Sequence, residues 1–466
     1  DRHVSARQAG IDFANSPSPL WCANFIGRQN LRRGIAPPDS GHPQFSKRSD
    51  DIDYQIEADF SGLIAPGMPN LVIELGEKFG RLMNYGDGLY AGQFMGAMYA
   101  EAFFNHNIDE IIAAGLAAIP AESQYAECVR DVVDWRRQNP DDWEKTWQLI
   151  HEKYHLNPDY QRYNFSAPLT PTTVNIDAKI NGAYVVMGLL YGQGDMDKTI
   201  IVSMRCGHDS DCNPSSAAGV LATTIGFSHL PEKYVSAINM QEKFIYSPYT
   251  FPLLVDLCGR LARQAIFRQG GHIEADADGK EVFVIPVEKP KPGRLERSWR
   301  PQPIAGNRYS PGEMRMIAYE PWYDISADAA KFAPGWTVIN CGRNMDPGFR
   351  PSWNGRKNVL VTHPITQETG CTLSQKVRVP ENQLTTLKLI VGHHDPESDW
   401  ILIVKVNGKS IFKQTIGKDG SKDGWVNIEI SLTEFADQEI DLELVNQLNG
   451  WKGEAAYWGE INIFSH

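Results

Sequence analysis

Long apolar runs are absent from this chain of 466 residues. Because a membrane-spanning helix needs about 18 or more consecutive apolar residues, we expect no membrane span. Clusters of Lys and Arg are also absent, and the formal net charge is −12. A nucleic-acid-binding surface needs clustered positive charge, so we expect no nucleic-acid partner.

Cysteine is sparse, with seven residues and no Cys-x-x-Cys pair. This scatter excludes a disulfide framework and a Cys-rich zinc module. Cys341 and Cys371 are the one pair whose spacing suggests a disulfide. An initiating Met and a signal sequence are missing as well, as in a chain whose export signal was removed or whose start was trimmed. We expect a periplasmic or secreted protein, with the cytoplasm as the alternative.

Strand-like alternation is almost absent from residues 1–270. Residues 1–48 are rich in Pro, Gly and Arg, and we expect them to be irregular. From Ser49 onward, apolar residues recur every three or four positions, which is the pattern of a helix buried on one face. Predicted helices cover residues 71–83, 92–104, 108–118, 125–137, 143–154, 176–190, 198–204, 215–225 and 253–267. The sequence therefore predicts an all-α domain over residues 1–270.

The pattern changes between residues 271 and 310, where five prolines stand among charged residues. This segment is predicted to be a linker or a strap across a domain surface. Beyond it, apolar residues alternate with period two, and predicted strands cover residues 387–391, 401–406, 426–430, 440–445 and 460–463. Asn407-Gly408 predicts a hairpin turn. Residues 311–466 are therefore predicted to form a β-sandwich of jelly-roll type.

An acidic motif runs from Gly207 to Pro214, with the sequence Gly-His-Asp-Ser-Asp-Cys-Asn-Pro. We expect a helix to follow, with Asn213 as its N-cap and Pro214 as its first residue. Asp209 and Asp211 could simply complement the positive end of that helix. One Asp would suffice for this purpose, however, and two in alternation repel each other unless a cation joins them.

A second acidic group is Ser49-Asp50-Asp51, followed by Asp53. We expect it to open a helix, with Ser49 as the N-cap. An ordinary acidic first turn is the alternative interpretation. If the two acidic groups meet in space, their hard oxygen atoms would hold Mg²⁺, Mn²⁺ or Ca²⁺.

Three further patterns have simpler explanations. His151-Glu152-Lys153-Tyr154-His155 matches the HExxH pattern of zinc peptidases, but a helix-breaking Asn-Pro follows and we favour a packed helix. His393-His394-Asp395 is predicted to be a loop between strands rather than a ligand site. Sandwich cores use Trp, so at most two of five tryptophans are expected to be exposed sugar binders. These five are Trp353, Trp400, Trp425, Trp451 and Trp458.

The two acidic groups together resemble a known family. Ser49-Asp50-Asp51 resembles the Thr-Asp-Asp motif of the ADP-ribosylglycohydrolases. The segment 207–212, with the small-residue helix after it, resembles that family's Gly-x-Asp-Thr-Asp-Thr motif. The segments 181–192 and 85–92 also look like the family, the second as it occurs in bacterial members. The resemblance covers roughly residues 45–268 and implies an all-α fold.

The resemblance also implies a pair of divalent cations, usually Mg²⁺ or Mn²⁺. Their implied ligands are Ser49, Asp50, Asp51, Asp209 and Asp211. The chain departs from the family in two places. Cys212 stands where the family has Thr, and a thiol is a poor ligand for a hard cation, which argues against a second metal. The family's N-terminal Gly-Asp-x-x-Gly helix is not recognisable in residues 1–48.

These features predict a metal-dependent hydrolase that cleaves a furanosyl glycosidic bond. The cation would orient the sugar hydroxyls and lower the pKa of a bound water, and Asp50 or Asp51 would accept the proton of that water.

The predicted substrate contacts are Tyr85, Gly86, Asp87 and Asn181, with a turn residue as the alternative for Asp87. A glycan-directed glycoside hydrolase on the same fold is the first alternative function. The β-sandwich, which could bind carbohydrate, suggests it. A non-catalytic glycan-binding protein is the second.

Overall fold

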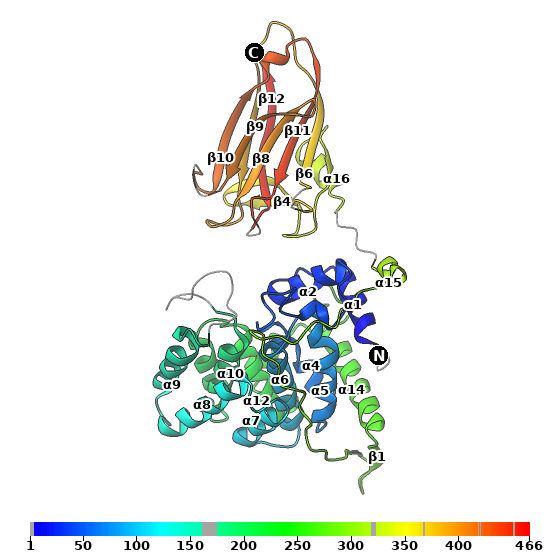
Figure 1. Ribbon diagram of the computed structural model, residues 1–466, viewed down its shortest axis with the longest axis vertical. Helices are drawn as coiled ribbons and strands as arrows, with labels where there is room; N and C mark the ends of the chain where they lie inside the picture. Colours follow the sequence, from blue (N-terminus) through cyan, green and yellow to red (C-terminus); the bar gives the residue numbers. More distant parts are fainter. Residues whose placement is uncertain are drawn as a thin grey trace. The chain divides into compact units, whose positions relative to one another are not determined.

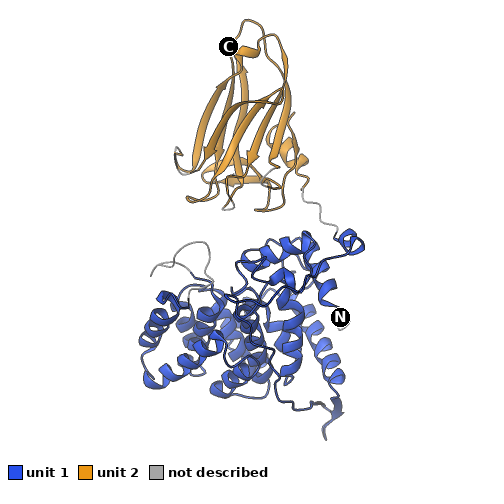
Figure 2. Ribbon diagram, viewed as in Figure 1, with its two compact units in different colours: residues 1–318 blue, residues 319–466 orange. Residues whose placement is uncertain are grey.

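The computed structural model describes residues 4–160, 175–317, 323–366, 369–417, 419, 421–450 and 453–466. The chain forms two compact units, residues 1–318 and residues 319–466 (Figure 2). The first is helical and the second is a β-sandwich, which confirms the predicted fold class. Within the described residues, no helix combines the length and the apolar character that crossing a membrane requires.

The helical unit is built around α6 (Asp87–Ala102) and α10 (Ala178–Gly192), which lie inside the bundle (Figure 1). All 15 residues of α10 are buried, so neighbours surround this helix on every side. Its glycines permit this packing, because a Cβ on Gly188 would lie 2.7 Å from the Cβ of Ser203. The surrounding helices are α3 (Asp53–Glu57), α4 (Asp59–Leu63), α5 (Pro69–Phe79), α7 (Ile108–Ala117), α8 (Gln124–Gln138), α9 (Trp143–Ile150), α11 (Met196–Arg205), α12 (Cys212–Ile225), α13 (Glu232–Val235) and α14 (Phe251–Arg268).

Residues 1–48 are not irregular, and that prediction was wrong. They form α1 (Ala6–Asn15) and α2 (Cys22–Arg32). The N-terminus of α2 has no cap from its own N-cap residue, Trp21. Its N–H groups are satisfied instead by Asp51 and Asp53, 28 and 29 positions further along the chain. A local sequence pattern cannot reveal a cap that arrives from so far away.

The proline-rich segment belongs to the helical unit. It begins with a small hairpin, β1 (His272–Ala275) and β2 (Glu281–Val284). Residues 291–309, which we call the strap, then run over the helices as an irregular segment. Its backbone N–H groups donate hydrogen bonds to the side chains of Asn70, Tyr90, Tyr85 and Asp39. The short helix α15 (Pro311–Met316) follows and pairs with α1 through Glu313 and Arg7, whose Nη2 lies 2.6 Å from Oε2.

The β-sandwich unit consists of two antiparallel five-stranded sheets with the orders β10-β7-β12-β5-β4 and β3-β6-β11-β8-β9. Strand β8 shows the predicted alternation, because Trp400, Leu402, Val404 and Val406 are buried while their neighbours are half-exposed. The predicted turn at Asn407-Gly408 joins β8 to β9, with positive φ at both residues. The strands are β3 (Thr337–Ile339), β4 (Gly348–Trp353), β5 (Arg356–Thr362), β6 (Cys371–Arg378), β7 (Thr385–Gly392), β8 (Trp400–Val406), β9 (Lys409–Ile416), β10 (Trp425–Ser431), β11 (Glu439–Gln447) and β12 (Ala456–Ser465), and the helix α16 (Ser326–Phe332) precedes them.

Tryptophan mostly fills the core of this sandwich. Trp400 and Trp458 are completely buried, and Trp425 is nearly so. Trp353 is half-buried, and Trp451 lies outside the described residues. The thiols of Cys341 and Cys371 are both buried and both free.

Candidate metal and substrate site

The loop before α12 is held in a left-handed turn. Gly207 and His208 have φ values of 86° and 55°. Asp209 then accepts the backbone N–H of Cys212 at 3.1 Å and so caps the helix, which begins at Cys212. The predicted N-cap, Asn213, instead lies in the first turn and is fully buried. The helix therefore starts earlier than predicted, because the Asp209 side chain satisfies the N–H of its first residue, Cys212.

Asn181 supports this loop from α10. Its Oδ1 accepts the backbone N–H of Asp209 at 3.2 Å and the Nδ2 of Asn213 at 2.8 Å. Its Nδ2 donates to the carbonyl oxygens of Asn175 and Asp177, each at 2.9 Å. All four hydrogen-bonding positions of the amide are thus used within the protein. This arrangement makes Asn181 a positioning residue for the acidic loop.

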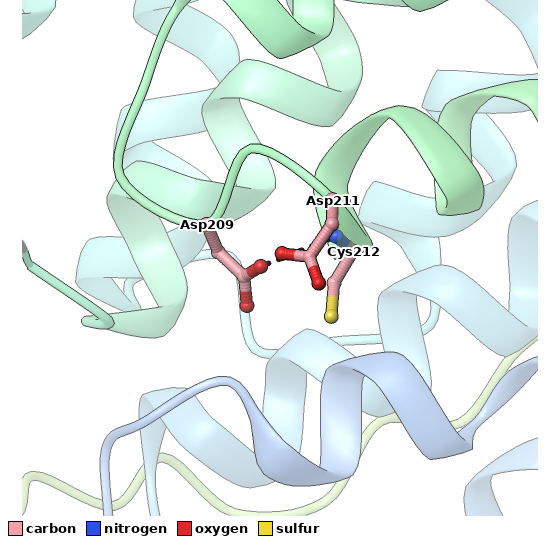
Figure 3. Close-up of side chains that lie close together, drawn as sticks. All are labelled: Asp209, Asp211 and Cys212. Atoms are coloured by element: carbon pink, nitrogen blue, oxygen red, sulfur yellow. Dashed lines mark hydrogen bonds between the residues drawn. The ribbon is translucent and has the colours of Figure 1, made fainter. Parts of the chain in front are cut away.

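Asp209, Asp211 and Cys212 converge. Their ligand atoms lie within 4.8 Å of one another, and among the described His, Cys, Asp and Glu side chains this is the group arranged closely enough to hold one metal ion (Figure 3). Burial, followed by the hydrogen bond with Asp211, raises the pKa of Asp209. The same hydrogen bond lowers the pKa of Asp211. The two carboxyl groups therefore need a proton or a cation between them.

The loop at Ser49–Asp53 lies against the N-terminus of α2. Oδ2 of Asp51 accepts the N–H of Ala23 at 2.8 Å, and Oδ2 of Asp53 accepts the N–H of Asn24 at 2.6 Å. Helix α3 begins only at Asp53 and has no side-chain cap, so the prediction that Ser49 caps a helix was wrong. The acidic residues cap α2 instead, where the helix dipole favours negative charge.

The two acidic loops interact electrostatically, and this interaction changes the pKa values of their side chains. Burial raises the pKa of Asp53 to about 6, and the nearby charge of Asp209 adds to this increase. Burial also raises the pKa of the Cys22 thiol to about 12, with contributions from Asp51, Asp53 and Asp209. Hydrogen bonds join the start of α2 to the Asp51–Asp53 segment, and Asp209 lies close enough for its charge to affect the pKa values of Cys22 and Asp53. The sequence analysis included Asp53 in the second acidic group, whereas no local sequence pattern pointed to Cys22.

Asp50 faces a different set of groups. Burial and the neighbouring charge of Asp87 raise its pKa well above the ordinary value. Burial also raises the pKa of Asp87 to about 6, although the charge of Lys179 opposes the increase. Lys179 is itself buried and pairs with Asp177, with 2.5 Å between Nζ and Oδ2. The buried, positively charged side chain of Lys179 thus lies among three buried carboxyl groups, those of Asp50, Asp87 and Asp177.

The strap covers Asp50. Oγ of Ser298 donates a short hydrogen bond to Oδ2 of Asp50. Gly86 has a φ of 55°, and a Cβ there would lie 3.5 Å from the backbone nitrogen of Ser298. Oη of Tyr85 accepts the N–H of Gln302 at 3.1 Å. Tyr85 and Asp50 therefore hold the strap in place beside Gly86, and Ser298 is a site residue that the sequence did not reveal.

The HExxH segment does not form a metal site within the described residues. His151–Leu156 is a turn of π-helix, and its histidine rings stack face to face instead of pointing at one centre. His155 then stacks on His208 with ring centroids 4.9 Å apart, and His208 stacks on Tyr184. His208 directly precedes Asp209 in the chain, so this stack of rings packs against the start of the acidic loop.

The donor atoms fit a hard divalent cation. Two buried oxygen atoms, Oγ of Ser49 and Oδ1 of Asp50, have no hydrogen-bond partner in the described protein. Such orphaned atoms are costly unless a ligand or water satisfies them. The carboxylates of Asp209, Asp211 and Asp53 are hard oxygen donors. Cys212 fits less well, because burial and Asp209 raise the pKa of its thiol to about 12 and keep it neutral.

The sandwich unit carries a separate pocket of about 680 Å³. It is lined by Trp353, Asn354, His394, Asp395 and Asp423, among others. The Trp353 ring stacks on Tyr457 and His394, with centroid distances of 4.6 and 5.8 Å. A hydrogen bond of 2.8 Å between Nδ1 of His394 and Oη of Tyr457 fixes this arrangement. The pocket thus combines an aromatic wall with carboxylates and an amide.

The first unit is a mainly helical domain with two acidic loops, and it is joined to a β-sandwich unit. The family model described as ADP-ribosylglycohydrolase matches residues 12–267, more than half of the chain. The chain therefore belongs to the ADP-ribosylglycohydrolase family, as its motifs indicated. The match begins within α1, so the helices that the sequence did not reveal are part of the family domain.

No curated protein matches the chain. Among solved structures, a family 35 carbohydrate-binding module from Paenibacillus barcinonensis is 12% identical, covering 29% of this chain and 96% of that one, with a TM-score of 0.21. The corresponding module from Clostridium thermocellum is 12% identical, covering 28% and 92%, with a TM-score of 0.21. A cyclase from Fischerella sp. TAU is also 12% identical, covering 28% and 74%, with a TM-score of 0.21.

Proposed function

We propose that the helical unit is a metal-dependent hydrolase of a furanosyl glycosidic bond, such as the bond to the ribose of an ADP-ribosyl group. The family supports a hydrolase. The observation that carries the finer proposal is the convergence of Asp209, Asp211 and Cys212, whose ligand atoms lie within 4.8 Å of one another, together with the charge interaction between Asp209 and Asp53 of the other acidic loop. Such a site suits a cation and the cis-diol of a furanose, which both need oxygen partners.

Asp209 and Asp211, whose ligand atoms converge, would hold the cation, and Asp53, Ser49 and Asp50 on the other acidic loop are the further candidate oxygen donors. Mg²⁺ and Mn²⁺ suit this donor set best, and Ca²⁺ is the next candidate. When bound, the cation would supply Lewis-acid polarisation of water and of sugar oxygens. Asp51 already accepts N–H groups with both carboxylate oxygens, so its main contribution is to fix the loop.

Asp50 is the proposed proton-transfer group. One oxygen of its carboxyl group accepts the Ser298 hydroxyl hydrogen, and the other has no partner in the described protein. Asp87 and Lys179 adjust the charge around it. A carboxyl group with a raised pKa can exchange a proton near neutral pH, as a general acid or base must. The strap excludes water from the side on which Ser298 lies.

The test compares release of ADP-ribose from a modified protein with release of sugar from aryl furanosides, each with Mg²⁺, Mn²⁺ or Ca²⁺. We expect cation-dependent cleavage that falls at least about 100-fold in the Asp209→Asn variant. Asp197→Asn is the matched control, because Asp197 is an exposed aspartate on α11 that pairs with Lys233. Full activity in a chelator would contradict the metal proposal. Cleavage of furanosides alone would move the substrate to a glycan.

The pocket in the sandwich unit favours a second function, which is glycan binding. Sugar rings present C–H faces that stack on aromatic rings, and their hydroxyls pair with carboxylates and amides. Trp353 with Asp395 and Asn354 offers both kinds of contact. The β-sandwich unit would then hold the hydrolase at a glycan. Alternatively, it would be the ligand-binding unit of a non-catalytic glycan-binding protein.

Affinity electrophoresis of the full chain on a panel of soluble polysaccharides tests this second function. We expect retardation that is lost in Trp353→Ala and kept in Phe464→Ala, a variant of an exposed aromatic residue on β12 of the same unit. Equal behaviour of the two variants would contradict a role for the pocket. Glycan binding without any hydrolysis in the preceding assay would favour the binding protein.

A further inference from the structure

Two cysteines lie together inside the β-sandwich unit. Cys341 follows β3, and Cys371 is the first residue of β6. Both side chains are buried, and both belong to the apolar cluster that fills the sandwich. The other five cysteines of the chain belong to the helical unit. Within its own unit, each of these two thiols therefore has only the other as a cysteine partner.

The pairing of β3 with β6 brings the two cysteines to neighbouring positions. The strands are antiparallel, and Ile339 lies opposite Thr372. Continued by one step, this register sets Asn340 opposite Cys371, and Cys341 follows directly. Neighbouring strands lie about 4.8 Å apart, and a disulfide joins Cα atoms that are about 4.4–6.8 Å apart. The strand pairing thus brings the two backbone segments into the range of a disulfide.

A left-handed residue turns Cys341 into the core. In a regular strand, residues two positions apart point to the same face, so Cys341 would share the face of Ile339, which is 56% exposed. Asn340 stands between them with a φ of 57°. This conformation, which asparagine adopts more readily than most residues, interrupts the alternation. Cys341 is therefore buried on the side of the sheet where Cys371 is also buried.

The end of β5 contacts both cysteines. Cys341 forms an isolated β-bridge with Pro364, two residues after the end of β5. The side chain of Thr362, the last residue of β5, forms a hydrogen bond with the Cys371 thiol. The two thiols also form a hydrogen bond with each other. A shared neighbouring segment and this direct contact both place the sulfur atoms side by side.

The folded, reduced chain protects this pair from oxidation. Burial raises the pKa of the Cys371 thiol well above its ordinary value, and the hydrogen bond with Cys341 adds to the increase. A cysteine attacks an oxidant as its thiolate, so a buried neutral thiol reacts slowly. In the unfolded chain the thiols are exposed and have pKa values of about 8.5. Oxidation of this pair is therefore fastest while the chain folds.

We propose that Cys341 and Cys371 form a disulfide that stabilises the β-sandwich unit when the chain folds in the presence of a small-molecule disulfide. The thiolate of one cysteine attacks a sulfur atom of the oxidant, forms a mixed disulfide and releases one thiol. The thiolate of the second cysteine then attacks the protein sulfur atom of the mixed disulfide and releases a second thiol. The cysteine pair loses two electrons and two protons, and the oxidant gains them as its two thiols.

The disulfide would fasten the segment in which the chain passes from one sheet to the other. β3 and β6 belong to one sheet, whereas β4 and β5 belong to the other. The bond would close a loop of about 30 residues that contains β4 and β5. A disulfide of this kind stabilises a protein mainly by restricting the unfolded chain. The β-sandwich unit should therefore unfold at a higher temperature after oxidation, and the helical unit should not.

Refolding of the full chain tests the proposal. The chain is refolded from denaturant in two buffers, one with oxidised and reduced glutathione and the other with a strong reductant. Peptide mapping by mass spectrometry without reduction should find peptides linked through Cys341 and Cys371 in the first sample only. Calorimetry should then show the β-sandwich transition raised by roughly 5–10 °C, with the helical transition unchanged. The native reduced chain, placed in the same glutathione buffer, should form the linked peptides at least about tenfold more slowly.

Two variants complete the test. Cys371→Ala should give no linked peptides and no rise in the transition temperature. Cys258→Ala is the matched control, because Cys258 lies on α14 of the helical unit, and it should keep both. If refolding is incomplete, the same peptide mapping is applied to chain synthesised by cell-free translation in the two buffers.

Three results would overturn the proposal. The first is a chain that folds in the glutathione buffer with Cys341 and Cys371 still reduced, or with glutathione attached to either of them. The second is a link from either residue to a cysteine of the helical unit. The third is a Cys341–Cys371 link that leaves the β-sandwich transition unchanged or lowers it.

Discussion

At the scale of single residues, the acidic site is a group of carboxyl groups. They lie closer together, and are more deeply buried, than is favourable for charged groups. Asp50, Asp51 and Asp87 are all buried. Burial is the largest cause of the raised pKa of each. Lys179 supplies one compensating positive charge. The remaining charge needs protons or a cation, which ties the stability of the helical unit to pH and to metal.

Asp87→Asn should change how stability depends on pH. The pKa of Asp87 is about 6 in the folded protein, against an ordinary value of 3.8, so the folded state binds the proton more tightly. Stability should therefore fall as pH rises from about 4 to about 6, by at most about 3 kcal/mol for this group. Asparagine still accepts the N–H of Tyr125 but carries no charge. Denaturant titrations in metal-free buffer should show the variant more stable at pH 7 and equal to the parent below pH 4.

Asp209→Asn should separate folding from metal binding. Without metal, removing one of two carboxyl groups in contact should leave the unfolding temperature unchanged or raise it, because their repulsion disappears. With a divalent cation at 100 times its dissociation constant, the parent should gain about 2.7 kcal/mol and the variant should gain none. An equal gain in both proteins would place the cation elsewhere.

At the scale of elements, three segments distant in sequence approach the Ser49–Asp53 loop. They are the start of α2, the loop before α12 and the strap. Each depends on a side chain from another segment: α2 on Asp51, the α12 loop on Asn181, and the strap on Asp39. The predicted elements from residue 71 onward largely match the structure, because their apolar periodicity is local. The segments between them were harder to predict, because their partners lie elsewhere in the chain.

The strap should loosen when Asp39 is removed. Asp39 is almost fully buried, and its carboxylate accepts the backbone N–H groups of Ala305 and Asn307, both at 2.8 Å. Asp39→Ala would remove the acceptor of two hydrogen bonds whose donors lie on partly exposed residues, so we expect a loss of about 1–3 kcal/mol in denaturant titrations. Limited proteolysis should then cut within residues 291–309. Asp12→Ala, on an exposed part of α1, serves as the control and should change neither measurement.

At the scale of the whole molecule, the chain contains two independent cores. One large cluster of buried apolar residues surrounds α6 and α10, and another fills the sandwich. We therefore expect two unfolding transitions in calorimetry. A divalent cation should raise only the transition of the helical unit, because the acidic loops lie there. A single transition, or a cation effect on both, would contradict this division.

The sequence by itself determined the class of each unit and the family of the first. Apolar periods of 3.6 and 2 are local properties, and the two acidic motifs carried the family resemblance. Only the tertiary structure decided which carboxyl groups share a site, because charge interactions and burial depend on distance in space. It showed that the charge of Asp209 acts on Asp53, that the charge of Asp87 acts on Asp50, and that Ser298 donates a hydrogen bond to Asp50. It also revealed α2, whose cap comes from residues about 28 positions away, and that separation is why no local pattern predicted it.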